Sequence, residues 1–282
     1  MPDAYFQLLD ATIQQLEELK ARGTRFVSVS PQMLETLARQ QEGRKNFKLQ
    51  TPNSKETSIS NVEKGTGQQE TGTATEPVAK EAAFADLQRR AMACVKCSHL
   101  ASSRKNVVFG VGNINAELMF VGEAPGAEED EQAEPFVGRA GQLLTKIIET
   151  MGLRRDSVYI ANILKCRPDT PGQAYGNRKP TPEEMQTCIP FLHEQIDLIK
   201  PKVLVALGGT AVEGLLGATG INKLRGNWHI YRGTPLMPTF HPAYLLRTPG
   251  DKRKVWEDML KVMERLGLPI SEKQQNFFLK TG

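Results

Sequence analysis

The sequence LMFVGEAPG at residues 118–126 joins an apolar run, typical of a buried β-strand, to a turn rich in glycine and proline. Further apolar runs lie at 158–163, 203–207 and 236–240, and helical patterns separate most of them. Strands that alternate with helices predict a mostly parallel sheet covered on both faces. We therefore expect an α/β fold of three layers, α/β/α, around a central, mostly parallel four-stranded sheet.

Composition divides the chain of 282 residues into four parts. Residues 1–40 carry an amphipathic helical pattern and predict an N-terminal helical extension, which either docks a protein partner or packs on the main domain. Residues 41–80 are rich in Gln, Thr, Ser, Gly, Lys and Glu, and they predict a flexible linker because they cannot bury enough apolar surface to offset the entropy of ordering. Residues 81–268 form the main domain, and 269–282 a C-terminal tail.

The composition is that of a soluble globular protein, with 39% hydrophobic and 24% charged residues. No apolar run is long enough to cross a bilayer, and the first residues lack the basic segment of a secretory signal. We expect a cytoplasmic protein with no membrane partner. Between residues 220 and 265 nine Lys and Arg stand against four acidic residues, which suits either a phosphate-facing surface or a solvated helix face.

Four cysteines, Cys94, Cys97, Cys166 and Cys188, are candidate metal ligands. Thiols stay reduced in the cytoplasm, so disulfides are not expected. The first two cysteines have the spacing of a metal-binding knuckle, and four thiolates suit either zinc or an iron–sulfur cluster. The alternative is that Cys166 and Cys188 are ordinary buried residues.

Three polar side chains follow the ends of predicted parallel strands. Glu123 comes after the first strand, Asn162 lies near the end of the second, and His241 comes after the fourth. Ligands of open parallel sheets bind beyond the carboxyl ends of the strands, so we expect these three groups at one edge. Each also has a structural reading, as a helix cap, a partner of buried backbone or a core histidine.

Common nucleotide-binding and deaminase motifs do not fit this sequence. Gly110–Asn113 lacks the third glycine of a dinucleotide fingerprint, and no P-loop lysine motif is present. The His-x-Glu element of the zinc deaminases is also missing.

Four motifs occur in order: GEAPG at 122–126, PFVGRAG at 135–141, NILKCRP at 162–168 and HPAYLLR at 241–247. Together with the four cysteines, they resemble the family 4 uracil-DNA glycosylases, the iron–sulfur type known from thermophiles. The resemblance covers about residues 84–268 and leaves out the N-terminal extension. It implies the fold of that superfamily, uracil-containing DNA as the partner, and hydrolysis of the N-glycosidic bond of uracil during base-excision repair, which leaves an abasic site.

The resemblance also implies a [4Fe–4S] cluster held by Cys94, Cys97, Cys166 and Cys188. The gap between the last two cysteines is longer than expected and includes a small insertion at 169–177. Loops tolerate insertions at little cost, so ligation should survive. We expect the cluster to organise loops and not to take part in redox chemistry.

The remaining site residues are assigned by the same resemblance. Phe136 would stack on the flipped uracil, Asn162 would read its edge, and His241 would donate a hydrogen bond to its O2 atom. Glu123 would act as general base or stabilise the positive sugar, while Ala124 and Pro125 would complete the pocket. Leu245, Leu246 and Arg247 would form a loop that enters the minor groove, unless one leucine belongs to a helix start packed on the core.

Three other functions fit parts of the pattern. A DNA-binding protein without activity would keep the metal site but lose Glu123, Asn162 or His241, and all three are present. A glycosylase could favour another base such as hypoxanthine, or remain attached to its product. Relatives that remain attached to their product carry a basic stretch that ends in His, whereas residues 176–180 contain no His. A partner-binding role fits the N-terminal region alone.

Overall fold

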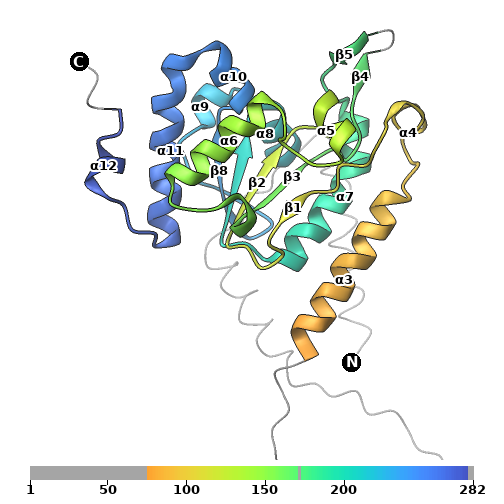
Figure 1. Cartoon of the computed structure of the whole chain (residues 1–282), viewed down its shortest axis with the longest axis horizontal. Coiled ribbons are helices and arrows are strands. Elements are labelled where there is room, and N and C mark those ends of the chain that lie inside the picture. Colours follow the sequence, from red (N-terminus) through yellow and green to blue (C-terminus); the bar gives the residue numbers. More distant parts are fainter. Residues whose placement is uncertain (1–74, 171–172, 279–282) are drawn as a thin grey trace, which may run out of the picture. The chain divides into compact units, whose positions relative to one another are not determined.

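The computed structural model describes residues 75–170 and 173–278 (Figure 1). The predicted N-terminal extension and most of the predicted linker lie outside the described residues. Within the part of the chain that is described, no helix combines the length and apolar character needed to cross a membrane.

A six-stranded sheet forms the centre of the fold, with strand order β1-β3-β2-β6-β8-β7. The four inner strands are parallel, and both edge strands are antiparallel to their neighbours. The strands are β1 (Val111–Gly112), β2 (Leu118–Gly122), β3 (Tyr159–Asn162), β6 (Val203–Leu207), β7 (His229–Tyr231) and β8 (Thr234–Thr239). The expected parallel core is thus confirmed, but the expected total of four strands was wrong. The edge strands have two and three residues, too few to show a periodic pattern.

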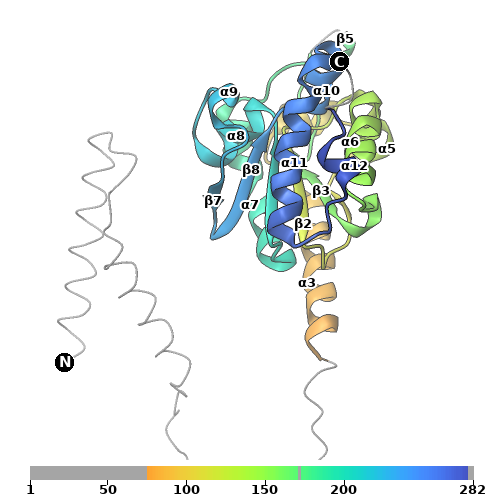
Figure 2. The same ribbon diagram turned by 90° about the vertical axis from the view of Figure 1, so that its left-hand side faces the viewer.

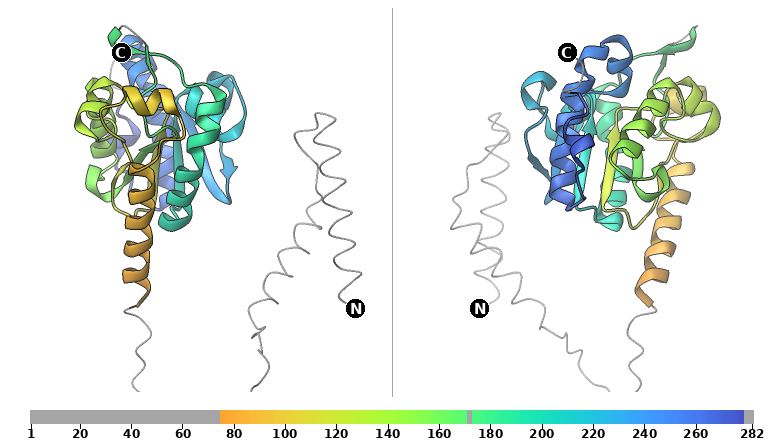
Figure 3. Two further views of the ribbon diagram at one scale, coloured as in Figure 1. Left: turned by 90° about the vertical axis from the view of Figure 1, so that its right-hand side faces the viewer. Right: turned by 60° about the vertical axis from the view of Figure 1, so that its left-hand side comes forward.

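Helices cover both faces of the sheet, which confirms the three layers. They are α3 (Thr75–Met92), α4 (Ser98–Ser103), α5 (Ala127–Gln132), α6 (Arg139–Thr150), α7 (Pro182–Ile199), α8 (Gly209–Leu216), α9 (Ile221–Leu224), α10 (Pro242–Arg247), α11 (Lys252–Leu266) and α12 (Glu272–Gln275). Single 3₁₀ turns lie at Arg155–Ser157 and Pro249–Asp251. Figure 2 and the right view of Figure 3 show α6 and α11 on one face, and the left view of Figure 3 shows α3, α4 and α7 on the other.

Successive side chains of β2 enter different cores because strand residues alternate between faces. Met119 and Val121 belong to the core under α3, α7 and α8, whereas Leu118 and Phe120 belong to the core under α6 and α11. All five β2 residues are buried. A strand buried on both faces therefore appears as a continuous apolar run, as the sequence indicated.

Two expected boundaries differ from the structure. Helix α3 begins at Thr75, inside the predicted linker, and buries Phe84 and Leu87. Its Ala- and Glu-containing sequence forms helix well even though its composition is polar. The predicted tail contains α12, which packs on the domain: the Trp256 indole donates to the Gln274 carbonyl (2.7 Å), and the Gln274 amide donates to the Thr150 carbonyl (2.8 Å).

Candidate active site

The carboxyl ends of the parallel strands place three polar groups along one edge of the sheet. Gly122 at the end of β2 pairs in register with Asn162 at the end of β3, and Glu123 follows directly. His241 follows β8, two strands further along the sheet. The structure therefore brings these residues to the edge that the strand pattern predicted.

Gly122 allows the close approach of two of the candidate residues. A Cβ atom on Gly122 would lie 2.6 Å from Cζ of Phe136 and would also overlap Oδ1 of Asn162. Only glycine fits between them without displacement. The Phe136 ring also lies 5.5 Å from the imidazole of His241, measured between centroids, with an interplanar angle of 32°. One aromatic ring thus borders both the amide and the imidazole.

The backbone of Phe136 is held in an uncommon conformation. Its φ angle is +56°, in the left-handed region that costs a residue with a Cβ about 1–2 kcal/mol. On one side the Arg155 guanidinium donates to the Pro135 carbonyl at 2.5 Å. On the other, Oε1 of Glu129 accepts from the backbone N–H groups of residues 137 and 138, both at 3.2 Å. The surrounding bonds fix the turn and offset its strain.

Asn162 is buried, with 2% of its surface exposed, yet its Oδ1 atom accepts no hydrogen bond from any described residue. A buried amide oxygen without a partner costs about 1–3 kcal/mol. The atom therefore has the free acceptor capacity that a bound donor group would use.

His241 is neutral and has its proton on Nε2. Burial, and to a lesser extent the charge of Arg247, lower the pKa of His241 to about 4. Its Nδ1 accepts the backbone N–H of Ala243 at 3.1 Å, which caps α10. A neutral imidazole that accepts at Nδ1 must donate at Nε2.

Glu123 is half-buried beside the start of α8. Burial raises the pKa of its carboxyl group, while a hydrogen bond from Thr210 and the charge of Lys179 lower it in part. The carboxylate therefore binds a proton more readily than an exposed glutamate, as a general base requires. The segment Ala124–Gly126 continues into α5, where Oε2 of Glu129 accepts the Gly126 N–H at 3.1 Å.

The segment expected to form a minor-groove loop is the helix α10. Pro242 occupies its first position and His241 caps it, so the sequence carries a helix start. Leu245 is only 1% exposed and packs in the core, so its prediction as a DNA-contacting residue was wrong. Leu246 is 38% exposed and Arg247 is exposed, so these two side chains remain on the surface.

All four cysteines line one small cavity of about 20 Å³, together with Leu100, Arg104, Leu164 and Thr187. Cys94 and Cys97 precede α4, Cys166 follows β3, and Cys188 lies within α7. None of them forms a disulfide. The described residues contain no group of three or more His, Cys, Asp or Glu side chains placed to hold a single metal ion.

The cavity disfavours bare thiolates. Burial raises the pKa values of the Cys97 and Cys166 thiols, and it raises that of Cys188 to about 11. Two donors work against this effect: the Arg104 guanidinium lies 2.9 Å from the Cys166 sulfur, and the Lys165 N–H lies 3.3 Å from the Cys188 sulfur. Four thiolates would need a positive centre among them. A group that offers one site to each of four sulfurs fits this donor set.

Residues 169–177, predicted from the sequence to be an insertion, include the paired strands of a hairpin beside the site. Strands β4 (Asp169–Thr170) and β5 (Gln173–Asn177) pair antiparallel and project from the domain near α5 (Figure 1). The Arg167 guanidinium donates to Oδ1 of Asn177 at 2.8 Å, and Nδ2 of Asn177 lies near Gly126. This hairpin thus adds surface next to the GEAPG turn.

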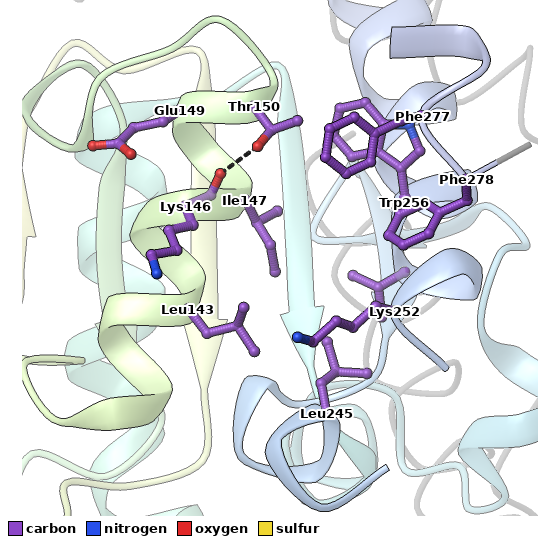
Figure 4. Close-up of a pocket in the computed structure, with 11 residues that line it drawn as sticks. Leu143, Lys146, Ile147, Glu149, Thr150, Leu245, Lys252, Trp256, Phe277 and Phe278 are labelled. Carbon is purple, nitrogen blue, oxygen red and sulfur yellow. Dashed lines mark hydrogen bonds between the residues drawn. The ribbon is translucent and has the colours of Figure 1, made fainter. Parts of the chain in front are cut away.

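A separate apolar pocket of about 490 Å³ lies between α6, α11 and the C-terminal aromatic residues (Figure 4). Trp256, Phe277 and Phe278 form one side, and Leu143 and Ile147 face them. Of the predicted site residues only Leu245 borders this pocket. Its size alone therefore does not identify it as the place of the chemistry.

Comparison with known proteins identifies the family. A family model described as "Uracil DNA glycosylase superfamily" matches residues 109–260. The chain is 42% identical to the type-4 uracil-DNA glycosylase of Thermotoga maritima over 201 residues, which are 70% of this chain and 95% of the relative. This chain belongs to the type-4 uracil-DNA glycosylases. It is also 40% identical to the type-4 uracil-DNA glycosylase of Archaeoglobus fulgidus over 202 residues, 68% of this chain and 96% of that one.

Several residues that shape the site of this uracil-DNA glycosylase were missed in the sequence. Gly208 has a φ angle of +92°, and a Cβ atom there would lie 2.8 Å from Cβ of His241. Thr210 bonds Glu123, and Arg104 bonds a cysteine. The Gly208-Gly209 pair directly after an apolar strand run was the available signal for the first two. No sequence signal pointed to Arg104.

Proposed function

We propose that this chain excises uracil from DNA in a pocket formed by Phe136, Asn162 and His241, hydrolysing the N-glycosidic bond and leaving an abasic site. The observation that carries the proposal is the buried, unpartnered Oδ1 atom of Asn162 beside the Phe136 ring. A base extracted from the stack needs both an aromatic surface and a partner for its polar edge.

Asn162 supplies the recognition of uracil. Its Oδ1 atom accepts from N3–H of uracil, and its amide NH₂ group donates to O4. Cytosine presents an acceptor at N3 and a donor at N4, so it opposes the amide at both atoms. Rejection of an analogue with unmatched buried groups is stronger than rejection by shape alone.

His241 favours the departure of the base. Breaking the C1′–N1 bond leaves negative charge on the uracil ring, which spreads to O2. The Nε2–H group of the neutral imidazole donates to O2, and this bond strengthens as the charge develops. The bond from Ala243 to Nδ1 supports the role because it keeps the proton on Nε2.

Glu123 acts on the sugar side of the bond. Its carboxylate orients the attacking water and stabilises the positive charge that forms on the sugar. The raised pKa of Glu123 supports the acceptance of a proton from that water. Ala124 and Pro125 close the pocket on this side.

The four cysteines hold a [4Fe–4S] cluster in this proposal, and that group supplies a structural cross-link with no electron transfer. Support comes from a cavity shared by the four thiols. The proposed ligands are Cys94 and Cys97 before α4, Cys166 after β3 and Cys188 in α7. A cluster held by these four residues would link the helix layer to the end of the base-reading strand.

Leu246 and Arg247 contact DNA in the proposal, because both are exposed on α10 directly after His241. We also propose that residues 1–40 dock a protein partner, that residues 41–74 link them to the catalytic domain, and that the protein acts in the cytoplasm. Four unpaired cysteines suit a reducing compartment.

A labelled oligonucleotide with one deoxyuridine tests the function. Wild-type protein, Asn162→Ala and His241→Ala are incubated with it and with thymidine and deoxyinosine controls, and alkali then cuts abasic sites. Cleavage at uracil alone, strongly reduced in both variants, supports the proposal. Binding without cleavage by a cluster-loaded wild type would favour a non-catalytic DNA-binding protein, and cleavage at deoxyinosine a different specificity.

A further inference from the structure

We propose that Lys165 is a positioning residue for Asn162: its buried ammonium group fixes the carboxyl end of β3 and so sets the place of the base-reading amide. The inference rests on the proposed role of Asn162. Lys165 is 2% exposed. Its Nζ atom donates to the Asn162 carbonyl oxygen at 2.8 Å and to Oε1 of Gln195 at 2.7 Å.

The Asn162 carbonyl needs this bond because the sheet does not extend far enough on that side. On the β1 side of β3, the register ends at the pair Val111 and Ile160, so no β1 residue lies opposite Asn162. On the β2 side, the Gly122 carbonyl accepts the N–H of Ile163, and the Asn162 carbonyl takes no part in that bond. The ammonium group of Lys165 takes the place of the missing strand partner.

Gln195 anchors the ammonium group to the helix layer. This side chain is fully buried in α7. Its amide NH₂ group donates to the Phe109 carbonyl at 2.9 Å and to the Tyr159 hydroxyl at 3.0 Å. These two oxygens fix the orientation of the Gln195 amide, and its own oxygen faces Lys165. The end of β3 is thus tied through Lys165 to α7, which also carries Cys188.

A role in positioning explains why a charge is retained in this core. Burying an ammonium group is costly, and the two oxygens that accept from Lys165, on Asn162 and Gln195, are both neutral. The Nζ atom of Lys165 also lies over the ring of Phe109, 5.9 Å from the ring centroid. An apolar side chain of the same length would fill the space without that cost. The charge strengthens the hydrogen bond to the Asn162 carbonyl, which a methionine cannot make.

The position of the carbonyl bears directly on recognition. The Asn162 side chain starts from the same Cα atom, and its Oδ1 atom already lies close against Gly122. A rotation of the terminal peptide would move the amide relative to Phe136. Misplacement by about 1 Å lowers rates about 10²-fold in other enzymes. Loss of the Lys165 bond should therefore act on catalysis through Asn162.

The experiment is a double-mutant cycle on the full chain, with single-turnover excision rates from a deoxyuridine oligonucleotide. Lys165→Met is made in the wild type and in Asn162→Ala, and Tyr231→Phe serves as control because it removes a different α7 bond, to His193. We expect Lys165→Met to lower the rate about 10- to 100-fold alone, as loss of a hydrogen bond from a charged group would, and less than twofold in Asn162→Ala. Cluster absorbance per chain and inhibition by free uracil are also measured on each variant. Lys165→Met should weaken the inhibition by uracil only in the background that retains Asn162.

Equal losses in both backgrounds, or no loss in the wild type, would overturn the proposal. If Lys165→Met does not fold, Gln195→Leu enters the same cycle, because it removes the second oxygen that orients the ammonium group. The two proposals fail in different ways. A wild type that leaves uracil in place refutes the proposed function together with this inference, whereas an active wild type with an additive cycle refutes the role of Lys165 alone.

Discussion

Gly122→Ala should inactivate the enzyme while leaving it folded. The new methyl group would lie 2.6 Å from Cζ of Phe136, whereas ordinary contacts of a Cβ atom begin at 3.4 Å, so the ring must move by at least about 0.8 Å. The overlap with Oδ1 of Asn162 forces a similar shift of the amide. Overpacking of this kind costs about 1–3 kcal/mol of stability. Displacement of both base contacts by nearly 1 Å predicts a loss of about 10²-fold in kcat/KM.

The assay is excision from a deoxyuridine oligonucleotide, with thermal unfolding followed in parallel. Gly250→Ala is the matched control, because a Cβ atom at Gly250 meets nothing within 4 Å. It should keep both the activity and the melting temperature. If Gly122→Ala excised uracil within threefold of the wild-type rate, Phe136 and Asn162 could not both be base contacts in the described geometry.

Three further predictions concern pH, helix α10 and the cysteines. The pKa of His241 is about 4 in the folded chain and 6.5 when exposed, so the unfolded chain binds more protons between these two values. The free energy of unfolding should therefore rise with pH across that window. Urea titrations of His241→Gln should show a shallower rise, and an unchanged slope would contradict the assignment. Leu245→Ala should destabilise the fold by about 2–5 kcal/mol, measured by thermal unfolding, because Leu245 is buried. Leu246→Ala should instead weaken DNA binding, measured by fluorescence anisotropy, at unchanged stability. The reverse pattern would refute the exposed role of Leu246. Cys188→Ser should lower both the melting temperature and the iron content per chain, and full iron content would exclude Cys188 as a ligand.

The parallel core of the fold was predictable because its strands are long, apolar and followed by turns. Each of β2 and β6 has five buried residues, so the run stands out in the sequence. The edge strands β1 and β7 were not predicted because pairing with a neighbouring strand, and not their own sequence pattern, makes them strands. Helix α3 escaped because the linker boundary was drawn from composition, which does not detect a polar helix with one apolar face.

The site was predictable where chemistry follows strand ends, and less so where contacts come from elsewhere. Asn162 and His241 could be placed at one edge from topology alone. A helix start with one buried leucine was kept as the alternative, but the sequence did not show that this leucine is Leu245, although Pro242 directly after a capping residue marks the helix start. Arg104 and Lys165 act through contacts with residues distant in sequence or through a buried network, and no local pattern encodes such contacts.

The left-handed backbone of Phe136 sets two contributions to stability against each other. Glycine, or asparagine to a lesser degree, occupies a φ angle of +56° more readily than phenylalanine does, and relief of the backbone would return about 1–2 kcal/mol. The ring, however, is buried in the core beside α6 and α11, and removal of a buried aromatic ring costs about 3–5 kcal/mol. A screen for heat resistance alone would therefore keep the aromatic ring, and survival in such a screen says nothing about excision.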